Sequence, residues 1–221
     1  RPLDPGVFPL PGEHGTGPAA CVEDAKSAVR WLRAHAGDLG VDPERIVAAG
    51  GSAGGHIAAC TALVGGFDSE REDARVSSRP SALVLFNPVL DVRSFGRGDP
   101  GGGNPPGGAT AEARAAISPS AALAKGAPPA LMFFGTKDRL LEQGRAFLEA
   151  SAKLGNRVEL HTADGQGHGF FNRAPWMKIT LRKADEFLAS LGYLEGPPIL
   201  EAPSEPRLAT ESSKTGQEAS R

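Results

Sequence analysis

A serine between glycines, placed where an apolar run changes into a run of small residues, is the feature that most constrains this chain. The pentapeptide Gly-Gly-Ser-Ala-Gly at residues 50–54 fits the Gly-x-Ser-x-Gly nucleophile elbow. The apolar residues 46–49 stop at this turn, and a helix-compatible run follows it. Glycines on both sides let strand and helix approach closely while the serine takes a strained backbone conformation. Because a chain with 29 glycines can contain this pentapeptide by chance, the strand–turn–helix context is what makes Ser52 a candidate nucleophile.

Composition favours one globular domain. The chain has 221 residues, 40% of them hydrophobic and 23% charged, and a net charge of −2, which gives no electrostatic reason to expect nucleic acid or a membrane surface as partner. No apolar run approaches the roughly 20 residues of a membrane span, and no signal peptide opens the sequence. The compartment, cytoplasmic or secreted, and the oligomeric state are left open. We expect an α/β domain over residues 1–194 and a disordered tail over 195–221, which is rich in Pro, Ser and Glu without periodicity.

Apolar runs alternate with amphipathic segments along the chain. We expect strands at 45–50, 82–86, 130–134 and 157–162, and helices at 18–36, after the elbow, at 140–154 and at 175–191. The first three strands lack polar alternation, as buried strands of a parallel sheet do. The fourth alternates, so we expect an edge strand with Glu159 and His161 facing outward. This alternation predicts an α/β fold with a mostly parallel sheet and functional groups at the carboxyl ends of the strands.

Three side chains with complementary chemistry follow predicted strand ends. Ser52 follows the first strand, Asp138 the third, and His168 lies in a glycine-rich loop after the fourth. A serine hydroxyl is a poor nucleophile at neutral pH, so a histidine must take its proton, and a carboxylate must fix the tautomer of that histidine. The chain order Ser, Asp, His is the order of α/β-hydrolases, whereas two other serine-hydrolase folds use different orders.

Other aspartates, histidines and cysteines of the chain have alternative or purely structural interpretations. Asp91, after the second strand, is the alternative acid, and Asp164 lies too near His168 in sequence to orient it easily. We interpret His56, on the helix after the elbow, as structural. The two cysteines, Cys21 and Cys60, have no Cys-x-x-Cys spacing, and two buried free thiols are favoured over a disulfide. No cluster has metal-ligand spacing, so we predict no metal and no cofactor.

Together these motifs resemble α/β-hydrolase esterases of the hormone-sensitive-lipase and acetyl-esterase type. The motifs that carry the resemblance are Gly-Gly-Ser-Ala-Gly-Gly-His at 50–56, Asp-Ala-Lys-Ser-Ala-Val-Arg-Trp-Leu-Arg at 24–33, Gly-Thr-Lys-Asp at 135–138 and Gly-His-Gly-Phe-Phe at 167–171. The resemblance covers about residues 13–192 and is closest to the bacterial branch that acts on small acyl esters, including sugar acetates. It implies Ser52 as nucleophile, Asp138 as acid, His168 as base, the Ala53 amide as one oxyanion-hole donor, and a small-molecule ester as substrate.

The chain departs from that family ahead of the elbow. The family carries a His-Gly-Gly-Gly loop there, which supplies the other oxyanion donors, and several earlier strands. Here His14-Gly15 is the only candidate, and it sits just before the first predicted helix. We therefore expect the carboxyl-terminal two-thirds of an α/β-hydrolase fold, with the N-terminal strands missing. The expected function is a serine hydrolase of short-chain carboxylic esters. The alternatives are a serine peptidase of the prolyl-oligopeptidase type, which shares the elbow and the residue order, and an inactive fragment or binding module that keeps the scaffold.

Overall fold

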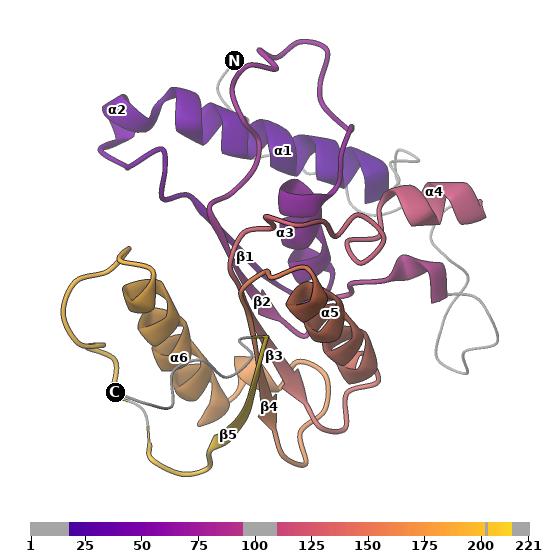
Figure 1. The fold of residues 1–221 in the computed structure, drawn as a ribbon. Helices are drawn as coiled ribbons and strands as arrows, with labels where there is room; N and C mark the ends of the chain where they lie inside the picture. The colour runs from indigo at the N-terminus through magenta and orange to yellow at the C-terminus, as the bar shows by residue number, and fades with distance from the viewer. Residues whose placement is uncertain (1–17, 95–109, 202, 214–221) are drawn as a thin grey trace.

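A five-stranded sheet flanked by helices on both faces forms the centre of the molecule (Figure 1). The computed structural model describes residues 18–94, 110–201 and 203–213. The strands are β1 (Val47–Gly51), β2 (Ala82–Phe86), β3 (Ala130–Gly135), β4 (Val158–Ala163) and β5 (Leu208–Ser212), and they lie in that order across the sheet. The first four strands are parallel and β5 is antiparallel to β4. The predicted α/β fold with a mostly parallel sheet is thereby confirmed.

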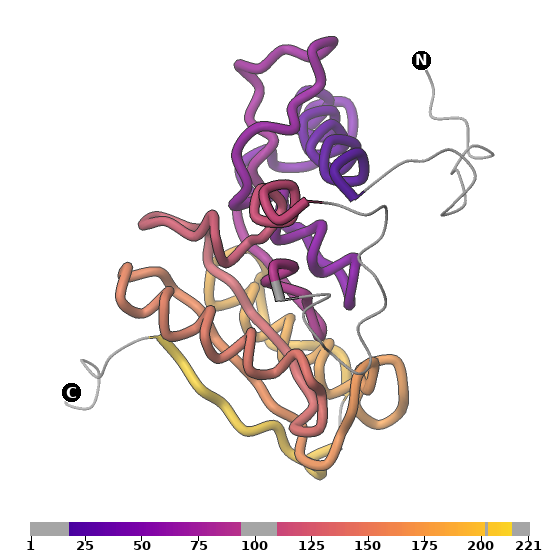
Figure 2. Tube along the Cα trace, turned by 90° about the vertical axis from the view of Figure 1, so that its right-hand side faces the viewer, coloured from indigo at the N-terminus to yellow at the C-terminus, as the bar shows by residue number. Residues whose placement is uncertain are grey.

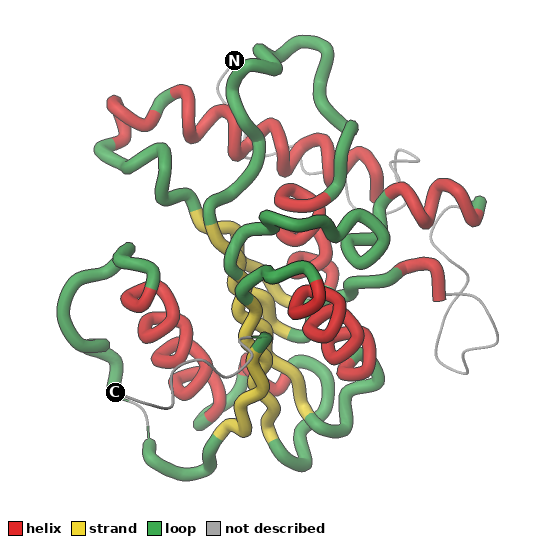
Figure 3. The backbone as a smooth tube through the Cα atoms, viewed as in Figure 1, coloured by secondary structure: helices red, strands yellow, loops and turns green. Residues whose placement is uncertain are grey.

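The helices connect the strands and cover both faces (Figure 3). They are α1 (Pro18–Ala34), α2 (Ala36–Leu39), α3 (Ala53–Leu63), α4 (Ala111–Ala116), α5 (Leu141–Lys153) and α6 (Trp176–Ser190), with 3₁₀ turns η1 (Val92–Ser94) and η3 (Phe170–Asn172). Helices α1, α3 and α5 lie on one side of the sheet and α6 lies on the other (Figure 1). Figure 2 places α1 and β5 at opposite ends of the molecule.

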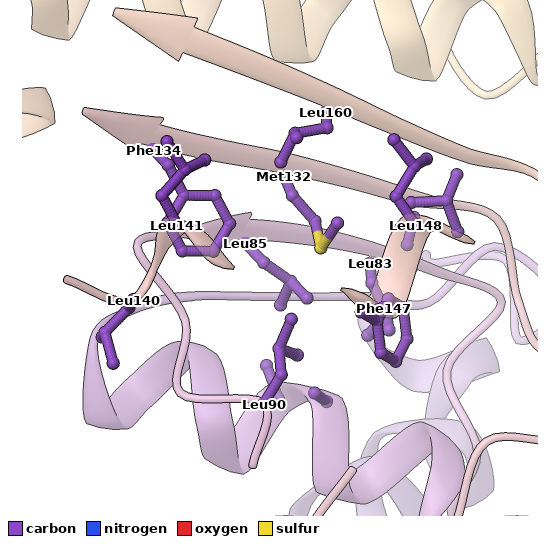
Figure 4. Close-up of a cluster of buried hydrophobic side chains, with 14 of the residues drawn as sticks. Leu83, Leu85, Leu90, Met132, Phe134, Leu140, Leu141, Phe147, Leu148 and Leu160 are labelled. Atoms are coloured by element: carbon purple, nitrogen blue, oxygen red, sulfur yellow. The ribbon is translucent and has the colours of Figure 1, made fainter. Parts of the chain in front are cut away.

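Successive side chains of the buried strands pack alternately into two separate hydrophobic cores, because neighbouring residues of a strand point to opposite faces of the sheet. Leu83, Leu85 and Met132 belong to the core under α3 and α5. Figure 4 shows Leu85 and Met132 on the side of the sheet where Leu90 and Phe147 also lie. Between them, Val84 and its neighbours on β3 pack against α6. Burial on both faces explains why these strands are apolar throughout.

Two expectations about the carboxyl-terminal part are wrong. Residues 208–212 are not disordered, because they pair with β4 from Glu159 opposite Ser212 to Ala163 opposite Leu208. The strand β4 is therefore not at the edge, and His161 is 2% exposed instead of facing outward. Thr210 Oγ1 lies 2.9 Å from His161 Nδ1, a hydrogen bond across the two strands. The domain boundary at residue 194 stays a prediction.

The two cysteines differ in their exposure to solvent. Both cysteines are free; Cys60 is buried as expected, but Cys21 is exposed because the buried stripe of α1 runs through Val22 and Val29.

Over the described ranges, no helix combines the length and the apolar character that a membrane crossing needs.

Glu159 on β4 is the basis of a pH-dependent stability prediction. Its Oε1 lies 3.0 Å from Arg157 Nη2, and its Oε2 lies 3.8 Å from His161 Nε2. The interaction with His161, and after it the pairing with Arg157, lowers the pKa of Glu159 to about 2, although burial opposes the shift. A depressed pKa stabilises the fold above the unfolded pKa of about 4.3, and this stabilisation is lost as the pH falls through the folded pKa.

We therefore expect Glu159→Gln to lower the Tm at pH 7 by about 2–4 °C if the interactions contribute about 1 kcal/mol. The difference from wild type should shrink as the pH falls from 5 towards 2. Thermal unfolding followed by circular dichroism at pH 7 and pH 3 measures it. Glu149→Gln, which breaks the exposed pair with Lys153 on α5, is the control and should change the Tm less. An equal difference at both pH values would show that ionisation of Glu159 is not the cause.

Candidate active site

The turn between β1 and α3 holds Ser52 in a backbone conformation that few residues adopt. Its φ is 54° and its ψ is −118°, a strained region for a residue with a side chain. The amide of Ser52 donates to the Phe86 carbonyl at 2.8 Å, which ties the turn to the end of β2. At Gly50, a Cβ would lie 2.4 Å from the Gly54 carbonyl carbon, so glycine is what allows strand and helix to come this close. The strand–turn–helix context predicted for the pentapeptide is present.

His168 lies in the loop that follows β4 and reaches back across the sheet to Ser52. Its Nε2 is 2.8 Å from Ser52 Oγ, and its Nδ1 is 3.0 Å from Asp138 Oδ2. The imidazole is 44% exposed, whereas the carboxylate behind it is fully buried. The three residues singled out from the sequence are thus brought into one hydrogen-bonded series, from three different strand ends.

Asp138 occupies the turn between β3 and α5, and this turn packs directly on the histidine loop. The Lys137 amide donates to the Gln166 carbonyl at 2.8 Å. A Cβ at Gly135 would lie 2.1 Å from the same oxygen, so only glycine permits this approach. The Leu140 amide donates to Asp138 Oδ1 at 3.0 Å and fixes one oxygen of the carboxylate. Backbone contacts therefore set the spacing between the acid and the histidine.

The other candidates from the sequence lie in different surroundings. Asp91 pairs with Arg93 at 2.6 Å, and this hydrogen bond is the main reason that the pKa of Asp91 is lowered. Asp164 accepts a hydrogen bond from Thr136 Oγ1 at 3.2 Å in the neighbouring loop. His56 is buried with its Nδ1 3.0 Å from the Val89 carbonyl, and burial lowers its pKa, which suits the structural role expected for it.

Asn87 is a site residue that the sequence analysis missed. It follows β2 directly, is fully buried, and its Nδ2 donates to Asp138 Oδ2. Its Oδ1 accepts from the Gly169 amide at 3.2 Å. The available signal was its position: a polar residue at the end of a buried strand of a parallel sheet lies at the edge where functional groups gather.

The amino end of α3 offers a donor beside Ser52. Ala53 is the first residue of this 11-residue helix, and amides of a first turn lack intrahelical carbonyl partners. The helix dipole adds partial positive charge at the same place. The other expected source of donors, His14-Gly15, lies outside the described residues. Within the described part of the chain, no group of three or more His, Cys, Asp or Glu side chains is placed to hold a metal ion.

The sheet, the strained serine and the order Ser, Asp, His define an α/β-hydrolase. Comparison with family models agrees, because the BD-FAE family model matches residues 14–150. The chain belongs to the BD-FAE family.

Several proteins similar to this chain are named as esterases. Carboxylesterase NlhH of Mycobacterium tuberculosis is 28% identical over 199 residues, which cover 78% of this chain and 58% of that protein. Esterase LipI of the same species is 34% identical over 177 residues, which cover 70% of this chain and 52% of that protein. The solved apo structure of Thermogutta terrifontis esterase 2 is similar with a TM-score of 0.76 and 42% identity, over 86% of this chain and 72% of that one. The chain spans between 52% and 58% of the length of these two curated relatives.

Proposed function

We propose that this protein is a serine esterase that hydrolyses short-chain carboxylic esters. The observation that carries the proposal is the unbroken series from Ser52 Oγ through His168 to the buried Asp138, with distances of 2.8 and 3.0 Å. Nucleophile and base within hydrogen-bond reach, with the base oriented by a third group, is the arrangement that activates a serine.

The residues divide the chemistry into two half-reactions. Ser52 Oγ attacks the ester carbonyl carbon while His168 Nε2 takes the hydroxyl proton, and Asp138 stabilises the imidazolium through Nδ1–H. The carbonyl oxygen becomes an oxyanion, which the Ala53 amide and the dipole of α3 stabilise. The tetrahedral adduct collapses, His168 returns its proton to the departing alcohol, and an acyl-serine remains. In the second half-reaction His168 takes a proton from water, which attacks the acyl carbon. The second tetrahedral adduct then collapses as His168 gives that proton to Ser52 Oγ, which releases the carboxylic acid and free Ser52.

The similar structures support a small acyl group and a nucleophile that reacts with organophosphates. Structures of Thermogutta terrifontis esterase 2 are described as propionate bound and butyrate bound. Others of the same enzyme are described as phosphorylated by paraoxon and phosphonylated by sarin. The esterase relatives also favour ester hydrolysis over the peptidase alternative.

Labelling by paraoxon tests the function directly. We expect stoichiometric inactivation, with the phosphoryl adduct on the peptide that contains Ser52 in mass spectrometry. An inert serine in a retained scaffold would show no adduct while the protein is folded by circular dichroism. A prolyl dipeptide p-nitroanilide in the same assay separates the peptidase alternative, because its cleavage at a rate above that of esters would contradict the proposal.

The acyl-length profile is a separate prediction. We expect kcat/KM for p-nitrophenyl acetate and butyrate to exceed that for the decanoate by about tenfold or more. A pocket too short for the added methylenes would discriminate against the decanoate by about 1–3 kcal/mol. Initial rates over a series from two to sixteen carbons measure this, and a peracetylated sugar in the series tests the sugar-acetate expectation. A profile that rises with chain length would contradict the short-chain assignment.

A further inference from the structure

Asn87 is held in an unusual backbone conformation at the end of β2. Its φ is +47°, in the left-handed region where asparagine is among the few residues with a side chain that occur regularly. Its amide donates to the Phe133 carbonyl at 2.7 Å, which anchors it to the end of β3. The residue is fully buried. Because a buried amide side chain costs free energy unless it is hydrogen-bonded, its partners indicate what the residue is for.

Those partners belong to two different parts of the candidate active site. The Nδ2 group donates to Asp138 Oδ2, and Oδ1 accepts from the Gly169 amide at 3.2 Å. The orientation of the side chain follows from this chemistry, since an ionised carboxylate only accepts and a backbone N–H only donates. One planar amide therefore bridges the acid and the residue that follows His168.

The bridge completes the hydrogen bonding of the Asp138 carboxylate. Oδ1 accepts from the Leu140 amide, and Oδ2 accepts from both Asn87 and His168. Without Asn87, the buried Oδ2 would lose one of these two donors, and the histidine loop would lose this tie to the acid. A displacement of about 1 Å in a catalytic group can cost about 10²-fold in rate.

We propose that Asn87 is a positioning residue for the acid–base pair: its amide fixes the Asp138 carboxylate and the backbone beside His168 at the same time. This keeps the proton of the imidazole on Nδ1 and leaves Nε2 free to take the proton of Ser52. The inference rests on the proposed function, in which His168 is the base. Asn87 acts through these two residues and does not itself touch the reacting atoms.

Asn87→Leu removes both hydrogen bonds and keeps the branched shape of the side chain, but it places leucine at a φ of +47°; it is therefore tested together with Asn87→Asp, which tolerates that φ. We expect kcat for p-nitrophenyl acetate to fall about 10²-fold with KM changed less than about twofold, because substrate contacts are untouched. The rate of paraoxon labelling should fall with kcat. The proton NMR signal of His168 Nδ1–H should move or broaden, a readout that needs no turnover. An unchanged kcat and an unchanged NMR signal would overturn the inference.

A matched control comes from another buried asparagine. Asn156, just before β4, accepts from the Gly126 and Ala127 amides and donates to the Ala124 carbonyl, all at the opposite end of the sheet from Ser52. Asn156→Leu should lower the Tm but leave kcat and the His168 signal unchanged. If both asparagine variants lose kcat equally, the role of Asn87 is general stability and the inference fails.

Asn87→Asp covers the case in which the leucine variant does not fold. A neutral carboxyl group can still donate to Asp138, but an ionised one cannot and repels it. We expect kcat relative to wild type to fall further as the pH rises from 6 to 9. A ratio that equals one across this range would contradict the inference. Wild-type protein that neither turns over esters nor reacts with paraoxon would instead refute the proposed function, and the NMR comparison would still report on Asn87.

Discussion

Replacing Ser52 with alanine should reduce the kcat for p-nitrophenyl acetate about 10⁶-fold, close to the limit of detection. The acyl-enzyme needs the hydroxyl oxygen, and losses of this size follow removal of the nucleophile because serine and histidine act as one unit. The Ser52 hydroxyl bonds to His168 Nε2 at the surface of the site, so its removal creates no buried cavity. We expect the Tm to change little, which thermal unfolding checks.

The control for this variant is Ser77→Ala, in the loop before β2, where the serine hydroxyl accepts from the Arg79 amide far from the elbow in sequence. This variant should keep wild-type kcat. Equal turnover by wild type and Ser52→Ala would refute the nucleophile assignment. Residual turnover in Ser52→Ala that paraoxon still abolishes would point to a contaminating esterase.

The parts of the site that could be predicted from sequence are those fixed by backbone geometry. The glycines around Ser52 are required by the close approach of β1 and α3, and such a requirement leaves a readable pattern. The apolar runs predicted β1 to β3, because these strands are covered by helices, and the alternation of residues 157–162 predicted β4. Asp138 and His168 could be placed because strand ends of a parallel sheet gather at one edge. Local sterics and burial therefore account for most of what could be predicted about the fold.

What the sequence did not predict depends on hydrogen bonds between distant segments. Strand β5 exposes nearly all its side chains, so its sequence lacks the apolar alternation by which a strand is recognised. Its backbone pairing with β4 keeps it in place, and that pairing also buries His161. Asn87 was missed for a related reason, since its importance comes from two partners 51 and 82 residues away. Side-chain type alone does not reveal such partners.

A single pair of variants decides whether Asp138 or Asp91 is the acid that orients His168. Asp138→Asn should lower kcat about 10⁴-fold, because an amide beside His168 Nδ1 no longer favours the tautomer that accepts the proton of Ser52. Asp91→Asn should leave kcat within about twofold, since the Asp91 carboxylate pairs with Arg93. Steady-state kinetics on both variants, at a temperature well below each Tm, measures the difference.

Asp138→Asn should also cost stability, and the reason lies in the same hydrogen bonds. The Asp138 carboxylate accepts from Leu140, Asn87 and His168, so each of these three hydrogen-bond partners is a donor. In either orientation an asparagine would turn its NH₂ group towards one of these donors, and a buried donor without an acceptor costs about 1–3 kcal/mol. We expect a Tm lower by about 2–4 °C for each kcal/mol lost. If Asp91→Asn were the variant that lost 10⁴-fold in kcat, the acid would come from the segment after β2, and the series through Asp138 would be structural.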